Sequence, residues 1–324
     1  MQNVGTPRFY INCYEYLEAV GGVLVHPDSA ISSTGIPESH GYLRTNPTKE
    51  YIMVQNDVED GYGDGIYYMD WVGITPAQLI GEKGFCALLG HNMASCGAIA
   101  RLENGYPGYD VMDSLELVVN SGISNGDMVV KPEFDGWSLW TGDFHNFDNS
   151  GFTDPAEYNT MQVRWESGVW NEVDTNPYNG IDLKCNSVVI GNYHDIQAPD
   201  LKLKLSYEYD GVKNIQTKGG ASLSNASYTK PADWGDMGAW QLGGASNLRN
   251  GRRVWDLSFS YLSDTDIMPV NATTSNPENT YPDDDTLLTG TDFFSRVWNR
   301  TMGGHLPFIF QPDKDNSNAD QFAL

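Results

Sequence analysis

The chain has 324 residues, 40% of them apolar, which is enough to build a core in one large domain or two smaller ones. Its formal net charge of −24 argues against nucleic-acid binding, because neutralising phosphates requires clustered lysine and arginine. No apolar run approaches the roughly 18 residues that span a bilayer, so we expect no membrane insertion. The N-terminus also lacks the charged and apolar regions of a secretory signal.

The first half of the chain predicts many short strands separated by turns. The segment 9–17 fits a strand or a short helix equally well. Short apolar or alternating runs, which are typical of strands, follow at 51–54, 66–72, 84–90, 98–103, 127–130, 137–140, 161–165 and 186–193. Short strands with this spacing favour a jelly roll or β-sandwich over residues 1–198.

The second half begins with the clearest strand pattern in the sequence. Apolar and polar residues alternate from Leu201 to Tyr209, and Asp210-Gly211 then predicts a turn. The segment 252–262 alternates in the same way. Apolar residues at 293, 294, 297, 298 and 302 have helical spacing, so we expect a helix over 291–302 that is capped by Thr291 or Asp292 and ends at Gly303-Gly304. A short, buried apolar strand is expected within 305–313.

The net charge is distributed unevenly along the chain. Residues 1–199 carry a net charge of −19 and residues 200–324 carry −5. This change, together with Ala198-Pro199, predicts a domain boundary near residue 198. The sequence therefore predicts an all-β fold with little helix, in which a jelly-roll domain (1–198) precedes a second β domain (199–324).

Three segments resemble the tail structural proteins of marine tailed bacteriophages. They are FCALLGHNMAS at 85–95, residues 209–231 with Tyr209-Asp210-Gly211 and Thr217-Lys218-Gly219-Gly220, and residues 252–313. The resemblance covers both halves of the chain. It rests on short runs of similar residues and on their order along the chain, not on a catalytic motif. It implies a discoidin-like jelly roll followed by a distal-tail or baseplate-like β domain.

No motif in the sequence indicates catalysis. The histidines form neither an HxH nor an HExxH spacing, the four cysteines lack zinc spacing, and no G-x-S-x-G motif occurs. His91-Asn92 is better explained as a turn held by side-chain-to-backbone bonds than as a catalytic pair. We therefore expect a protein that is not an enzyme and has no required cofactor. The cysteines are expected to be free and mostly buried.

One acidic loop has the spacing of a calcium site. Its candidate ligands are Asn146, Asp148, Ser150, Phe152 and Glu157. Gly151 would allow the sharp turn of such a loop. The preceding residues do not have a helical pattern, however, and an acidic chain matches this spacing by chance. An ordinary surface loop is the alternative.

Aromatic and basic residues in the second half predict an interface between chains. The candidates are Arg252, Arg253, Trp255, Phe293, Phe294 and Trp298. Basic residues at 213–253 could also face the acidic half of a neighbouring copy.

The function expected from these features is structural: a tail or baseplate component of a phage virion, made in the host cytoplasm, that forms a homo-oligomer and contacts other tail proteins. A host-surface glycan is a further possible partner. The alternatives are a carbohydrate-binding module or glycan-degrading enzyme, which the jelly roll and aromatic residues also permit, and a capsid decoration protein.

Overall fold

The protein is described here by a computed structural model. It describes residues 5–20, 52–53, 65–70, 80–104, 115–119, 122–123, 129–143, 160–167, 183–185, 187–201, 203–208, 214–224, 252–269, 290–318 and 321–323. Antiparallel strands dominate these residues, and the helices are few and short. The predicted all-β class is therefore confirmed.

The largest element is a six-stranded antiparallel sheet. Its order is β17 (Phe308–Gln311), β1 (Arg8–Asn12), β12 (Ser187–Asp195), β4 (Gly84–His91), β9 (Gly136–Gly142) and β6 (Leu115–Val119). Strand β1 lies between β12 and β17, with Tyr10 opposite both Tyr193 and Ile309. The first described strand is thus paired with one of the last.

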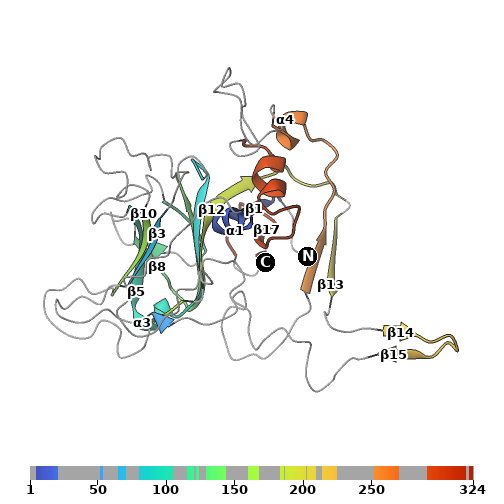
Figure 1. Cartoon of the computed structure of the whole chain (residues 1–324), viewed down its shortest axis with the longest axis horizontal. Helices are drawn as coiled ribbons and strands as arrows, with labels where there is room; N and C mark the ends of the chain where they lie inside the picture. The colour runs from blue at the N-terminus through green and yellow to red at the C-terminus, as the bar shows by residue number, and fades with distance from the viewer. Residues whose placement is uncertain are drawn as a thin grey trace, which may run out of the picture.

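A second antiparallel sheet has five strands. Its order is β3 (Gly65–Asp70), β10 (Thr160–Ser167), β5 (Ala98–Asn104), β8 (Val129–Lys131) and β7 (Gly122–Ile123). Three two-stranded sheets pair β2 (Ile52–Met53) with β11 (Leu183–Lys184), β13 (Lys204–Glu208) with β16 (Arg252–Asp256), and β14 (Asn214–Gln216) with β15 (Ser222–Ser224). Figure 1 shows the five-stranded sheet on one side of the six-stranded sheet, while β14 and β15 stand apart from both.

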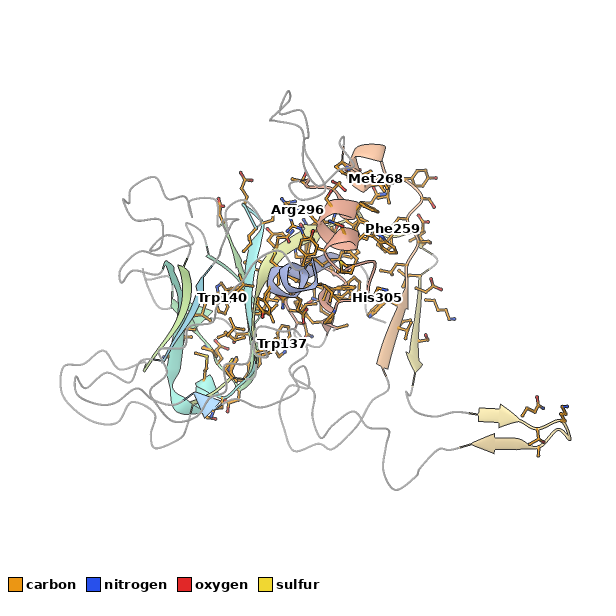
Figure 2. The ribbon with its side chains drawn as sticks, viewed as in Figure 1. Trp137, Trp140, Phe259, Met268, Arg296 and His305 are labelled. Atoms are coloured by element: carbon orange, nitrogen blue, oxygen red, sulfur yellow. The ribbon has the colours of Figure 1, made fainter. Side chains whose placement is uncertain are left out.

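The core lies on both faces of the six-stranded sheet. Trp137 and Trp140 of β9 point to opposite faces of the sheet, because side chains alternate along a strand. Both are at most 1% exposed, so both faces are covered there. Figure 2 shows Trp140 on the side of the five-stranded sheet and Trp137 towards the other side. On the Trp137 face, the buried cluster is formed by Tyr10, Phe85, Ala87, Leu89, Trp137, Leu139, Val189, Ile309 and Phe322.

The segment that the sequence left ambiguous is both a strand and a helix. Strand β1 runs directly into α1 (Cys13–Val20), and Asn12 stands at the junction. The Oδ1 atom of Asn12 accepts the backbone N–H of Tyr14 at 2.9 Å, which is the bond of a helix N-cap. The chain crosses over Gly191 of β12 here, and a Cβ at that glycine would overlap the carbonyl oxygen of Ile11.

The predicted helix over 291–302 exists as a π-helix, η2 (Phe294–Asn299), with further turns after it. Asp292 caps it as expected, because its Oδ1 atom accepts the backbone N–H of Ser295 at 2.9 Å. The helix is followed by Met302, Gly303 and Gly304 with positive φ, which ends the helical path. Arg300, 2% exposed, anchors this end through a 2.6 Å bond from Nη1 to Oδ1 of Asn192.

The last described residues close the core from within the same chain. Phe310 and Ala323 exchange two backbone hydrogen bonds of 2.8 and 2.9 Å. Phe322 is 4% exposed, and its ring centroid lies 5.0 Å from that of Trp137. Phe322 is therefore covered by residues of the same chain.

The alternating segment 201–209 is a strand only from Lys204. Leu201 was expected on a buried face but is fully exposed, and it lies before the first residue of β13. The boundary near residue 198 stays a prediction. Strand β17, which belongs to the second predicted domain, pairs with β1 of the first.

Candidate functional site

A small polar pocket of about 190 Å³ lies where the end of β12, α4 (Asp264–Ile267) and the residues before η2 meet. Three carboxylates, an imidazole and an amide line it, and no lysine or arginine is among the lining residues. The lining residues are His194, Asp195, Ile196, Gln197, Leu262, Asp266, Thr291 and Asp292. These residues come from three separate segments of the sequence, and the fold brings them together.

One of the three carboxylates is neutralised by neighbouring cations. The guanidinium of Arg8 donates to Asp195 through Nε at 2.5 Å and Nη2 at 3.0 Å. The ammonium of Lys314 lies 3.8 Å from the same carboxylate. Arg8 also lies over the ring of Tyr193, 4.0 Å from its centroid, which fixes the guanidinium beside β12.

The other two carboxylates are held by serines. Asp292, which is 5% exposed, accepts the hydroxyl of Ser295 at 2.7 Å in addition to its helix-capping bond. Asp266 accepts the hydroxyl of Ser263 at 2.5 Å and its backbone N–H at 3.3 Å. Within the described residues, neither Asp266 nor Asp292 forms an ion pair with a lysine or arginine. Both therefore bring negative charge to the pocket.

His194 forms the inner wall of this pocket. It is 7% exposed, and its ring packs edge-on against Phe293 with 5.9 Å between centroids. Its Nδ1 atom is buried and makes no hydrogen bond. Burial lowers the pKa of His194 to about 4, and the positive charges of Lys83 and Arg296 act in the same direction. The ring is therefore neutral at pH 7 and adds no positive charge to the pocket.

Most of the large exposed apolar side chains belong to the C-terminal part of the sequence. Among the described residues, the large ones are Phe134, Leu201, Tyr261, Met268, Trp298 and Met302. All except Phe134 belong to the C-terminal part of the sequence. Near one of them, the side chain of Gln197 donates to the backbone carbonyl of Tyr261 at 2.5 Å. Figure 2 shows Phe259 and Met268 beside β16 and α4 at the right of the molecule.

Comparisons with protein-family models, with curated proteins and with solved structures find no match. The site is therefore interpreted from its own geometry.

The predicted interface residues have different environments. Trp255 is half-buried, with its ring centroid 6.0 Å from that of Phe310, and Phe293 packs on Phe9 at 5.6 Å. Phe294 is also half-buried, whereas Trp298 is 50% exposed. Arg252 and Arg253 lie on β16 opposite Glu208 and Tyr207 of β13. Trp298 is thus the predicted residue with the clearest access to a partner.

His91 has the structural role that the sequence indicated. Its Nδ1 atom accepts the backbone N–H of Met93 at 3.3 Å, at the start of α3 (Met93–Cys96). Its Nε2 atom lies 2.9 Å from the hydroxyl of Ser138 on the neighbouring strand β9.

Three of the four cysteines are free and buried, as predicted: Cys13, Cys86 and Cys185. Burial raises the pKa of Cys185 to about 12, so it is a thiol at neutral pH.

The candidate calcium loop, with Asn146, Asp148, Ser150, Phe152 and Glu157, lies outside the described residues. If it binds calcium, a chelator should lower the melting temperature, because a ligand that binds the native state stabilises it. Replacing Glu157 with alanine should remove the difference between the two melting curves, whereas Glu133→Ala should keep it. Identical curves for the wild-type protein with and without chelator would favour the ordinary loop.

The pocket was not predicted from sequence. Its lining residues lie at 194–197, 262–266 and 291–292 and share no motif. The one available signal was the expected N-cap at Asp292. A capping carboxylate normally serves its own helix, so that position alone did not indicate a pocket.

Within the described residues, no three His, Cys, Asp or Glu side chains are placed to hold a metal ion. No helix among them is long and apolar enough to cross a bilayer.

Proposed function

We propose that this chain is a structural component of a tailed-phage virion, a tail or baseplate protein that acts by assembling with other copies of itself and with neighbouring tail proteins. The direction of the proposal comes from the resemblance of segments 85–95, 209–231 and 252–313. A jelly roll in the first half, of the discoidin-like kind, is part of the same proposal. The β-rich fold is compatible with it.

The observation that supports assembly is the exposed apolar surface of the C-terminal part. Trp298 in η2 and Met302 in the turn that follows the helix are 50% and 42% exposed. Tyr261 and Met268 add further exposed apolar area near α4. Aromatic residues and methionine are enriched in the cores of protein interfaces, and grouped apolar exposure marks interaction sites.

The rigid support of this surface favours a binding role. Gly303 lies against the indole of Trp298, since a Cβ at that glycine would be 3.6 Å from the ring. Behind it, Arg300 and Asn192 tie the helix to the six-stranded sheet. A partner that covers Trp298 would therefore meet a side chain held on an anchored element, which reduces the entropy lost on binding.

Self-association tests the proposal directly. The wild-type chain should form oligomers in sedimentation velocity, and Trp298→Glu combined with Met302→Glu should weaken association by about 30-fold or more, as expected for an interface hot spot. The matched control is Phe134→Glu, because Phe134 is 39% exposed but lies in the turn before β9. Mass spectrometry of purified virions should also detect the protein.

Two results would contradict this function. One is a chain that stays monomeric at high concentration and binds no tail protein. The other is its absence from purified virions of a phage that encodes it.

A further inference from the structure

We propose that residues 321–323 form an exchangeable plug. In the free chain the plug fills a site beside β17 of its own chain, and in the assembled protein it fills the same site of a neighbouring copy. The plug site consists of the rings of Tyr10 and Trp137 and the outer backbone edge of Phe310. The inference rests on the proposed function, because it names one contact through which copies assemble.

The plug site is built around an aromatic side chain. The ring of Phe322 lies edge-on to that of Trp137, with 5.0 Å between centroids, and 6.4 Å from that of Tyr10. Phe322 is 4% exposed, and the two rings that it covers are at most 1% exposed. Without the plug, Trp137 and Tyr10 would lose this contact and meet water, which is unfavourable for large apolar groups. The site therefore needs an occupant in every stable form of the protein.

The edge of β17 holds the backbone of the plug. The N–H of Ala323 donates to the carbonyl of Phe310 at 2.9 Å, and the N–H of Phe310 donates to the carbonyl of Ala323 at 2.8 Å. Phe322 points to the Trp137 face, because side chains alternate along an extended segment. Backbone pairing at a sheet edge with one apolar anchor is a common way for one chain to bind a segment of another. The contact is the same whether or not both partners belong to one chain.

An exposed polar turn joins the plug to β17. The amide of Gln311 donates to the carbonyl of Asn316 at 3.0 Å, which keeps the first part of the turn at its own strand. After that point Ser317 and Asn318 are exposed and carry no apolar side chain, so opening the turn there uncovers little apolar surface. The chain from Asn316 to Gln321, when extended, spans roughly 17 Å. It therefore reaches the plug site of a copy that packs directly against this end of the molecule.

One group of the plug is unsatisfied in the free chain. Gln321 is 2% exposed, and its Nε2 atom has no hydrogen-bond partner within the described residues. A buried amide without a partner is uncommon and costs free energy. Gln321 lies between the turn and Phe322, where the surroundings of the plug change when it moves to another copy. A neighbouring chain can therefore supply the acceptor that is missing in the free chain.

A second copy is the occupant that these observations favour. Reciprocal exchange fills every plug site and buries every Phe322, so the ring contacts and both backbone hydrogen bonds are kept. Exchange of an identical element between copies costs little for this reason, and the surface between the copies is an additional gain. A foreign peptide would instead displace the plug and leave Phe322 open to water.

Photo-cross-linking distinguishes exchange from closure within one chain. Phe322→p-azidophenylalanine keeps an aromatic ring in the site and links to its neighbours on irradiation. Unlabelled and isotope-labelled chains, mixed in equal amounts, are refolded together at high concentration until sedimentation velocity shows oligomers. For random exchange, about half of the peptide pairs that join position 322 to the segment around Trp137 should contain both isotopes. Because Phe322 is buried, a neighbour that touches only the outer surface cannot give this product.

The matched control places the same probe at Phe9, whose ring packs on Phe293 and Phe308. Its cross-links to these residues should contain one isotope only. A second variant needs no probe: Phe322→Ala should weaken self-association at least about tenfold, as for loss of an interface anchor. Phe322→Leu should keep most of the affinity, because leucine still fills the site with apolar atoms.

The outcomes separate this inference from the proposed function. Oligomers in which position 322 is linked only within one isotope overturn the exchange, and so does a folded Phe322→Ala chain that associates as tightly as the wild type. If Trp298→Glu with Met302→Glu still weakens association in either case, the assembly function stands without the plug. Mixed pairs from Phe9 that are as frequent as those from position 322 would show unspecific linking and also overturn the exchange. A wild-type chain that never associates contradicts both.

Discussion

Replacing Gly191 with alanine should lower the free energy of unfolding by more than about 3 kcal/mol, which corresponds to a melting temperature roughly 10 °C lower in a chain of this size. The added Cβ would overlap the carbonyl oxygen of Ile11 and lie 3.0 Å from the backbone nitrogen of Cys13. Both obstacles are backbone atoms at the junction of β1 and α1, so no side-chain rotation can relieve the overlap. Thermal or denaturant unfolding of the purified chain measures the effect.

The matched control for Gly191→Ala is Gly219→Ala. The nearest atom to a Cβ at Gly219 is the hydroxyl oxygen of Thr217 at 3.9 Å, which is ordinary contact. We expect this variant to unfold within about 0.5 kcal/mol of the wild type. If Gly191→Ala is equally harmless, the chain does not cross β12 at Gly191 as the structure has it.

Acidification should destabilise the fold between pH 7 and pH 5 through two buried histidines. Burial lowers the pKa of His91 to about 4 against a weaker opposing effect of Asp135, and it lowers the pKa of His194 to about 4 as well. Each group is neutral in the fold but takes up a proton near pH 6.5 when unfolded. The contribution of each neutral histidine to the free energy of unfolding is therefore complete above pH 6.5, and it is lost as the pH falls towards 4. By linkage the loss at pH 5 is about 2 kcal/mol for each histidine.

The hydrogen bond of His91 fits the neutral ring that burial favours. Its Nδ1 atom accepts the N–H of Met93, and a proton there would set two donors against each other. Denaturant midpoints measured from pH 7 to pH 5 should fall, and His194→Gln should remove part of the slope. His305→Gln, which changes an exposed histidine, should keep the wild-type profile. A stability that is flat over this interval would contradict the buried, neutral state of both rings.

Local patterns predicted most of the described strands. The apolar run 84–90, the alternation at 161–165 and the run 186–193 correspond to β4, β10 and β12. The helix after Asp292 was predicted from its apolar spacing and its cap. These features depend on neighbouring residues, so one sequence was enough to place them.

Features that depend on distant residues could not be predicted in this way. The pairing of β1 with β17 joins positions about 300 residues apart, and each strand alone is compatible with many partners. The same limit applies to the pocket, because Asp266 and Asp292 meet His194 only after three segments have packed. Leu201 shows the opposite error: it belongs to the alternating pattern, but it lies before β13 and is fully exposed.

The place of β1 between β12 and β17 has a consequence for folding during synthesis. Strand β1 is synthesised before its partner β17 and the covering Phe322, which follow it by about 300 residues, so it lacks both until they have been made. Pairings of such long sequence separation form slowly, and an unpaired strand edge is prone to aggregate in the meantime. We expect nascent chains to depend on chaperones until the region around residue 310 is free to close the sheet.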